Sequence, residues 1–356
     1  MTGKRFARLA AAVAVCLLVL AAFVVQLLGG RGSVPGWQQL RAALGVPLQT
    51  EESAPRTADG STVVYVLDVG QGDAVLLCQD GAYCLIDTGP AEAEDALLYD
   101  LDVLGVPSLE YLVMTHPHAD HTGNARAVLR TLPVKTLLLP LWQPTADETA
   151  DWPRHLAELA ADSGAEILTA EAGEEYPLGS GKLQILQGGS EDADSVNDAS
   201  LCTLFTAGDF RFLDTGDAEA DAEQRLVDTY GPTLHATLFK AGHHGSYTSN
   251  SLTFMQAVRP EAVAVSCGLH NDYGHPHRAA LQNYAEVGAE VWRTDLEGSL
   301  TFIWQNNTLN VETSADSADF AAEKEGVEND DYGTVQSQTL RFLYRMLPAE
   351  TDNPDG

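Results

Sequence analysis

Three histidines and one aspartate crowd into the stretch that decides the fold, THPHADH at residues 115–121. An apolar segment typical of a buried strand, LEYLVM (109–114), precedes it, and a segment of helical periodicity, HTGNARAVLRTL (121–132), follows. His116 and His118, two apart in extended chain, point to the same side. Asp120 and His121 follow at the turn into the helix and face a second point nearby. Imidazole and carboxylate are ligands of divalent ions, so the stretch predicts a metal site.

Two later segments carry the same residue types. FLDTGD (212–217) is predicted to be a strand that runs into a glycine turn, which places Asp217 well to bridge two metals. KAGHHGS (240–246) presents His243 and His244 on a turn bounded by glycines. Taken alone, Asp217 is better explained as a turn or helix-capping residue. Taken together, the three segments predict a site for two metal ions.

With these segments the sequence resembles the metallo-β-lactamase superfamily, whose HxHxDH motif residues 116–121 meet. It is similar, more narrowly, to the hydrolase domain of ComEC-type DNA-uptake proteins. The matching stretches are LDVGQGDA (67–74), LIDTG (85–89), LDTGD (213–217), KAGHHGS (240–246) and YGHPH (273–277), with TDLEG (294–298) matching the signal of the branch's closing strand. The resemblance spans residues 62–304. It implies an α/β fold, the αββα four-layer sandwich, with metals at one edge of two facing sheets.

The resemblance also implies a role for each polar residue of the motifs. The first metal would be held by His116 and His118 and the second by Asp120 and His121, with Asp217 as the bridge and one of His243 or His244 completing the second metal. The superfamily often has a further histidine before the bridging aspartate, where this chain reads SVNDAS (195–200). Asn197 is the candidate that replaces it. Asp87 and Asp68 are expected to orient ligands. The expected cofactors are two divalent ions, zinc first, with manganese and magnesium as alternatives.

The activity implied is hydrolysis by a metal-bound hydroxide of a phosphodiester in DNA, a nucleotide or the cell wall. The residues expected to take part in catalysis are Asp120, Asp217, His243 and Lys240, and the expected substrate contacts are Ser246, His275 and His277. Hydrolysis of a lactam, lactone or thioester uses the same ligands and stays an alternative, as does a catalytically silent metal-binding module. Flavodiiron-like redox proteins have a carboxylate where this chain has His118, which counts against that function.

Composition limits the partners. The 356 residues include 20 Lys+Arg and 51 Asp+Glu, a net charge of −31, and 45% are hydrophobic. So apolar a chain is not disordered throughout, and so acidic a chain is not a protein that coats nucleic acid. Metal ions can supply positive charge locally, so phosphodiester chemistry is compatible with this composition. Tight binding to long DNA is disfavoured, although DNA stays among the candidate substrates.

Four regions are predicted along the chain. Basic residues precede an uncharged run at 9–30, roughly 33 Å long as a helix, so residues 1–30 are expected to form a single-pass membrane anchor with the catalytic domain outside the cytoplasm. A cleaved signal peptide is the alternative. Residues 31–60 are expected to be a linker, 61–313 the hydrolase domain and 314–356 an acidic tail with a short apolar segment. Cys78 and Cys84 flank a turn-like segment, where a disulfide and two half-buried thiols are both open.

Overall fold

The computed structural model describes residues 60–141, 163–189 and 195–314, together with residues 156, 158 and 160. The expected anchor, the expected linker and nearly all of the expected tail lie outside these residues. In the part that is described, none of the helices has the length and apolarity needed to cross a bilayer.

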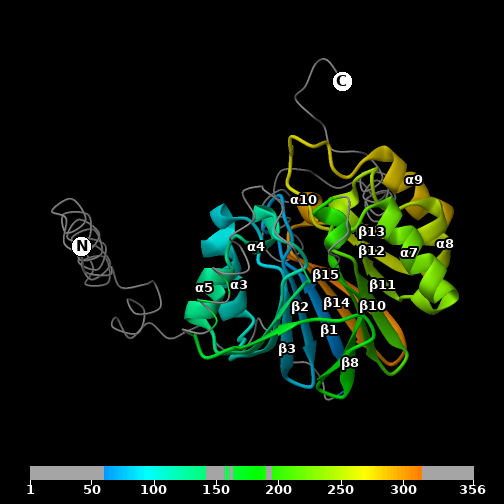
Figure 1. The fold of residues 1–356 in the computed structure, drawn as a ribbon. Coiled ribbons are helices and arrows are strands. Elements are labelled where there is room, and N and C mark those ends of the chain that lie inside the picture. The colour runs from blue at the N-terminus through cyan, green and yellow to red at the C-terminus, as the bar shows by residue number, and fades with distance from the viewer. Residues whose placement is uncertain are drawn as a thin grey trace, which may run out of the picture. The chain divides into compact units, whose positions relative to one another are not determined.

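Two β-sheets face each other (Figure 1). The first has eight strands in the order β15-β14-β1-β2-β3-β4-β5-β6: β1 (Thr62–Val66), β2 (Val75–Gln79), β3 (Ala82–Ile86), β4 (Leu109–Val113), β5 (Val134–Leu139), β6 (Glu166–Thr169), β14 (Leu300–Gln305) and β15 (Thr308–Thr313). The second has seven in the order β13-β12-β11-β10-β9-β8-β7: β7 (Glu175–Leu178), β8 (Gly181–Gly188), β9 (Leu201–Ala207), β10 (Phe210–Asp214), β11 (Leu238–Lys240), β12 (Ala262–Val265) and β13 (Glu290–Arg293).

Helices cover the outer face of each sheet. The first sheet is covered by α3 (Glu94–Val103) and α5 (Ala125–Thr131), and the second by α7 (Ala220–Tyr230), α8 (Leu252–Val258) and α9 (Arg278–Glu286). Shorter helices occupy the loops: η1 (Ala91–Ala93), α4 (Ala119–Thr122), η3 (Asn197–Ala199), η4 (Gly231–Leu234), η5 (Gly242–Gly245) and α10 (Thr294–Glu297). The α/β fold with two sheets is therefore confirmed.

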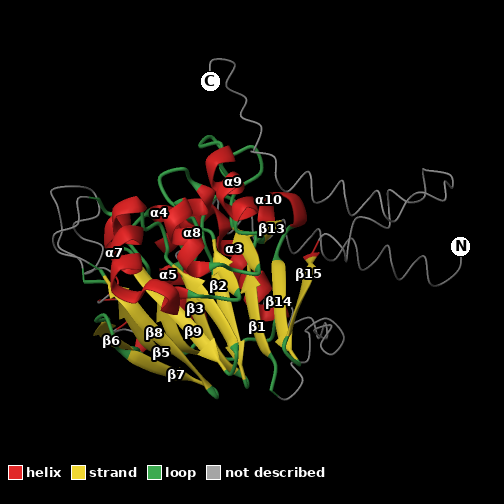
Figure 2. Cartoon of the chain, turned by 90° about the vertical axis from the view of Figure 1, so that its right-hand side faces the viewer, coloured by secondary structure: helices red, strands yellow, loops and turns green. Residues whose placement is uncertain are grey.

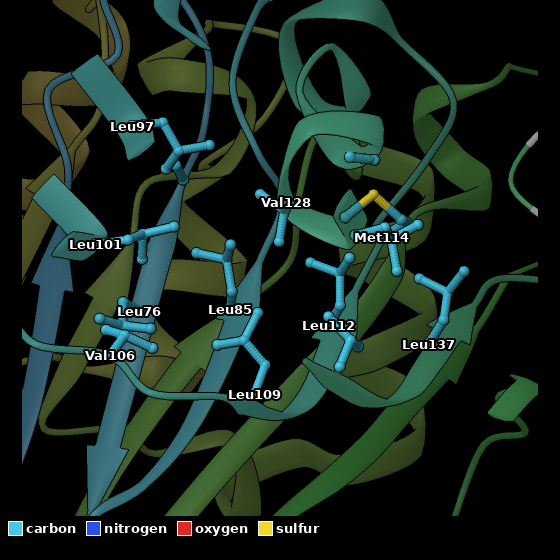
Figure 3. Close-up of a cluster of buried hydrophobic side chains, with 14 of the residues drawn as sticks. Leu76, Leu85, Leu97, Leu101, Val106, Leu109, Leu112, Met114, Val128 and Leu137 are labelled. Carbon is cyan, nitrogen blue, oxygen red and sulfur yellow. The ribbon is translucent and has the colours of Figure 1, made fainter. Parts of the chain in front are cut away.

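Three apolar cores separate the four layers, because residues that alternate along a strand face opposite sides of the sheet. In β1, Val63 and Tyr65 pack toward the helices, whereas Val64 and Val66 pack between the sheets. Figure 3 shows the outer core, where Leu97 and Leu101 of α3 lie over leucines of β2 to β5. The central strands β1, β2, β11 and β12 are buried at every position, which explains why they are almost continuously apolar in sequence.

The loops that carry the predicted metal ligands meet at one edge of the sandwich. Strands β3, β4 and β5 run parallel, and so do β10, β11 and β12. The carboxyl ends of parallel strands lie at one edge, where open α/β sheets bind ligands. The loops after β3, β4, β10 and β11 hold Asp87, residues 116–121, Asp217 and residues 243–244 in turn. Figure 2 shows α4, which belongs to this loop set, at the upper end of the strands.

The structure settles two local features. TDLEG, which matched the signal of the closing strand, contains one helical turn, α10, at residues 294–297, and the strand β14 begins at Leu300. Of the two alternatives at Cys78 and Cys84, the disulfide is excluded, because both thiols are free and buried. Cys78 opposes Tyr83 and Cys84 opposes Leu77 in the β2–β3 pairing, so the two thiols point to opposite faces of the sheet.

Candidate metal centre

Asp217 is the point at which the predicted ligands converge. It follows β10 at Gly216, whose φ of +52° suits glycine. A Cβ at Gly216 would lie 2.8 Å from Cβ of Thr115, so only glycine lets this turn approach the loop after β4 so closely. The sequence Thr-Gly-Asp thus brings a buried carboxylate against the HxHxDH segment.

One set of ligand atoms, the outer group, consists of His116, His118 and Asp217. His116 Nε2 and His118 Nδ1 are 2.9 Å apart, which confirms that these two rings face the same point. His116 Nε2 is 3.7 Å from Asp217 Oδ2. His116 is buried, whereas His118 is partly exposed, so this group opens toward solvent on the His118 side.

A second set, the inner group, consists of His121, His244 and Asp217, with Asp120 at its edge. His121 Nε2 lies 3.3 Å from Asp217 Oδ1, and His244 Nε2 lies 3.7 Å from Asp217 Oδ2. His244 Nε2 is also 3.3 Å from Asp120 Oδ2. Asp217 Oδ1 therefore faces His121 of the inner group, whereas Oδ2 lies 3.7 Å from both His116 of the outer group and His244 of the inner group. The carboxylate thus contacts both groups, as expected of a bridging residue.

Three buried atoms of the inner group have no hydrogen-bond partner: His121 Nε2, His244 Nε2 and Asp217 Oδ1. Buried polar atoms are nearly always paired, because an unpaired one loses its hydration without compensation. All three are lone-pair donors of the kind that bind zinc and similar ions. The residues present therefore fit a divalent cation.

Buried carboxylates fix the other nitrogen of both inner imidazoles. Asp87 Oδ2 is 2.7 Å from His121 Nδ1, and the same carboxylate accepts bonds from the Thr115 backbone and hydroxyl. Asp73 Oδ1 is 3.1 Å from His244 Nδ1. Such contacts set ring orientation and tautomer in metal sites. The geometry agrees with the role expected of Asp87, and Asp73 plays the same part for His244.

Asp73 was missed by the sequence prediction, although it stands in the matched stretch LDVGQGDA. It also lies in the cluster of potential ligands around His121, His244 and Asp217. Both its oxygens are engaged, one by His244 and the other by Lys240 Nζ at 2.5 Å. We therefore assign Asp73 to orienting His244 rather than to binding metal. Burial alone would raise the pKa of Asp73, but Lys240 and His244 outweigh it and hold that pKa well below its usual range.

The two groups differ in their affinity for protons. Burial opposes the charged form of His244, but Asp73 and Asp217 outweigh it and raise its pKa to about 10. Burial, aided by His121, lowers the pKa of His116 well below its ordinary value. In the absence of metal the inner group thus holds protons that a cation must displace, which makes binding pH-dependent.

A solvent-open cleft of about 280 Å³ lies over these groups. Its lining consists of Gln71, His118, Ala119, Asp120, Asp217, His243, His244, Tyr273 and His275. None of these residues is a lysine or an arginine. The cleft therefore gives access to Asp217 and His118 without offering the permanent charge of a lysine or an arginine to an anionic ligand.

The turn at residues 243–244 places its two histidines in different surroundings. Both histidines adopt left-handed backbone conformations, with φ of +49° and +55°. His244 is buried in the inner group. The His243 side chain is 22% exposed, and its Nε2 is 3.7 Å from Asp217 Oδ2. The structure thus assigns the inner position to His244 and the cleft wall to His243.

Four other predicted site residues lie away from the cleft lining. Lys240, expected to take part in catalysis, is fully buried and paired with Asp73. Ser246, an expected substrate contact, is buried, with its hydroxyl 3.0 Å from that of Thr248. His277 does not line the cleft, and its Nδ1 accepts from the Tyr247 N–H. Asp68 is exposed and accepts from the Gly70 N–H, so it caps a turn and orients none of the imidazoles.

The last two predicted residues lie nearer the cleft. His275 is one of the residues that line it. Asn197 donates through Nδ2 to Glu219 Oε1 at 3.3 Å, and Glu219 lies 3.5 Å from His243 Nδ1. Its buried Oδ1 has no partner. That Asn197 takes part in metal binding stays a prediction.

Comparisons with known proteins identify the family of the chain. The family described as "Metallo-beta-lactamase superfamily" matches residues 67–269. The chain is 32% identical to Competence protein ComA of Neisseria gonorrhoeae over 80% of this chain and 38% of that protein. It is 28% identical to ComE operon protein 3 of Bacillus subtilis over 72% of this chain and 35% of that protein. The chain thus matches little more than a third of the length of these relatives.

A solved structure also aligns with this one. It is that of the metallo-beta-lactamase fold protein YhfI from Bacillus subtilis, at 14% identity and a TM-score of 0.48, over 69% of this chain and 99% of that one.

Proposed function

Because the chain belongs to the metallo-beta-lactamase superfamily, in the branch of ComEC-type competence proteins, we propose that it is a two-metal phosphodiesterase. The observation that carries the proposal is the convergence of two ligand groups on Asp217, with three unpartnered ligand atoms beneath an open cleft. The substrates proposed are phosphodiesters of DNA, of a nucleotide or of the cell wall.

We assign some of the described residues to metal binding and others to contact with the substrate. We infer that His116, His118 and Asp217 would hold one divalent ion, and that Asp120, His121, His244 and Asp217 would hold the other. Zinc suits these imidazole and carboxylate ligands, and manganese or magnesium are alternatives. When bound, such ions supply positive charge to a phosphate and lower the pKa of water. The cleft lining has no cation of its own, so this charge would be the main attraction for an anionic substrate.

Two cleft histidines are placed to handle protons and oxygens of the substrate. His243 Nδ1 is 3.1 Å from the Thr248 hydroxyl, which leaves Nε2 directed toward Asp217 and the cleft. We infer that His243 gives a proton to the leaving oxygen. Burial and the nearby His244 lower the pKa of His275 to about 3, so its ring is neutral and its N–H can donate to a phosphoryl oxygen.

The test is a side-by-side assay of the purified full chain. We expect about two equivalents of divalent metal by elemental analysis. We also expect hydrolysis of bis(p-nitrophenyl) phosphate that chelation abolishes and metal restores. Absence of bound metal, with activity unchanged by chelator, would contradict the proposal. Turnover of a β-lactam or a thioester in place of the phosphodiester would favour the carbonyl-hydrolase alternative, which uses the same ligands.

We also propose that residues 1–30 anchor the protein in the cell membrane, with residues 61–313 outside the cytoplasm. The support is the uncharged run at 9–30 that follows Lys4, Arg5 and Arg8. We expect the full chain to sediment with membranes and to be digested by protease added outside intact cells with their wall removed. Recovery of a shortened, soluble chain from the medium would instead indicate a cleaved signal peptide.

A further inference from the structure

Aromatic rings form a continuous rim beside the cleft. The rim, as we use the term, consists of Tyr247, His277, His275 and Tyr273, in the order in which they touch. The Tyr247 and His277 ring centroids are 4.8 Å apart, those of His277 and His275 are 4.8 Å apart, and those of His275 and Tyr273 are 5.5 Å apart. His275 and Tyr273 also line the cleft, so the rim begins where the ligand groups open to solvent.

The two tyrosines of the rim are exposed to an unusual degree for their size. Tyr247 is 68% exposed and Tyr273 is 65% exposed, and among the described residues the only other exposed tyrosine is Tyr99 on α3. Tyr273 lies nearly parallel to His275, at 18°, so one face is covered by the imidazole. Its exposure leaves the other face free for a planar group.

Hydrogen bonds hold the rim in place. The Tyr247 N–H donates to His277 Nδ1 at 3.1 Å, and the His277 N–H donates to the Gly245 carbonyl at 2.9 Å. Asn271 bonds both the N–H and the carbonyl of His275. The backbone of Tyr247, His275 and His277 is therefore fixed before any ligand arrives, which lowers the ordering cost of stacking on the rim.

The charge around the cleft indicates which kind of substrate would bind more tightly because of the rim. The lining contains Asp120 and Asp217 and no lysine or arginine, and the chain carries a net charge of −31. Proteins that bind long nucleic acids rely on cations along the phosphate backbone. Here the affinity beyond the metals has to come from contacts with a neutral part of the substrate, and exposed tyrosines stack on nucleobases regardless of base identity.

We propose that Tyr273 and Tyr247 are specificity-determining residues that stack on a nucleobase next to the scissile phosphate. This inference rests on the proposed phosphodiesterase function and narrows it to nucleotides and the ends of short nucleic acids. A wall phosphodiester made of sugar or glycerol units has no planar group to stack. The rim therefore separates the candidate substrates that share the same phosphate chemistry.

The test uses two substrates that differ only in the base. These are the p-nitrophenyl ester of thymidine 5′-phosphate and the same ester of its abasic analogue, each assayed with the metal-loaded full chain. We expect kcat/KM to favour the base-bearing ester by about fivefold or more. Tyr273→Ala should bring the ratio toward one through KM, whereas Tyr273→Phe should keep it. Tyr247→Ala should lower it in part, and Tyr99→Ala is the matched control that should leave it unchanged.

Binding provides a second measurement that does not depend on turnover. By calorimetry we expect thymidine 5′-phosphate to bind more tightly than its abasic analogue, and Tyr273→Ala to remove the difference. Equal binding of the two by the wild type would overturn the role of the rim, even if both esters are hydrolysed. A binding preference without hydrolysis of either ester would support the rim and contradict the proposed phosphodiesterase function.

Discussion

The two ligand groups that share Asp217 differ in how firmly they are held. In the inner group, His121 and His244 are buried and each has its Nδ1 beside a buried carboxylate, from Asp87 and Asp73. In the outer group, His116 Nδ1 has only the Thr115 hydroxyl at 3.1 Å, and His118 is partly exposed at the cleft. The inner group is therefore preorganised, whereas the outer group is open and adjustable.

This difference suggests a division of labour between the two positions. A ligand whose other nitrogen is fixed by a carboxylate binds metal more tightly, because ring orientation is set in advance and basicity is raised. A ligand at the cleft surface can move with the substrate. We expect the inner ion to be held tightly and the outer ion to be exchangeable. Four predictions test this comparison. The first changes a residue that both metal positions need, and the last changes a residue that leaves both metal positions intact.

Asp217→Ala should have the largest effect, because it removes the oxygen that both groups share. We expect loss of metal from both positions and a fall in kcat/KM of about a thousandfold or more, since metal stabilisation of transition-state charge amounts to several kcal/mol. Elemental analysis and steady-state kinetics measure the two effects. Asp95→Ala, on the exposed face of α3, is the matched control. Retention of one tightly bound ion in Asp217→Ala would show that the groups do not depend on a common bridge.

His118→Ala should separate the two positions. We expect this variant to lose the weaker of two metal-binding steps and keep the tighter one, whereas His121→Ala should lose the tighter one. Competition with a chelator of known affinity measures both steps, and His235→Ala, an exposed histidine outside the cleft, serves as control. The division of labour is wrong if His118→Ala and His121→Ala weaken the same step.

Asp73→Asn should weaken the inner position without removing any metal ligand. We expect the inner ion to bind about 10–100-fold less tightly, the range for changes to the partners of ligating histidines. The variant also leaves Lys240 buried without its ion-pair partner, so its free energy of unfolding should fall by about 3–5 kcal/mol.

A double variant separates the two consequences of losing Asp73. Adding Lys240→Met removes the unpaired charge, so stability should recover at least in part while metal affinity stays low. Thermal unfolding of the metal-free proteins and metal titration give the two readouts. Full recovery of metal affinity in the double variant would mean that Asp73 acts only through folding.

The metal-binding motifs and the fold class could be predicted from the sequence. The HxHxDH segment predicted its own geometry because its residues are neighbours in one chain segment, and Asp217 was predicted because a strand and a glycine turn precede it. The two facing sheets were implied by the resemblance to the superfamily. Residues 166–169 and 175–178 form strands, β6 and β7, of only four residues each with exposed positions, which is too short for a periodic pattern to identify them.

The residues that orient the metal ligands could not be predicted, because their partners are distant in sequence. Lys240 was expected to take part in catalysis, yet it is buried against Asp73, which lies 167 residues earlier. No local pattern predicts that a lysine at the end of a strand is fully buried. The two histidines at 243–244 were likewise equivalent in sequence, and only the left-handed turn shows that one faces the inner group and the other the cleft. Sequence therefore predicted the ligands better than the residues that orient them.

The smallest expected effect on the metal centre comes from a buried acid behind the 242–246 turn. Glu223 on α7 accepts from the N–H groups of Asn250 and Ser251, and Asn250 in turn bonds the backbone of Gly242 and Ser246. Burial raises the pKa of Glu223 from an ordinary 4.5 to about 7. The folded protein therefore binds this proton more tightly than the unfolded chain does.

Stability should accordingly fall as pH rises from about 4.5 to 7, where the unfolded chain releases this proton before the folded one, and the contribution should be constant outside that window. The difference between the two pKa values corresponds to about 3 kcal/mol at most. In Glu223→Gln this part of the pH dependence should vanish, whereas Asp221→Asn, exposed on the same helix, should keep it. Chemical unfolding of the metal-free proteins at several pH values measures the difference. If both variants follow the wild-type pH curve, Glu223 is ionised in the folded protein, and its two N–H contacts outweigh its burial.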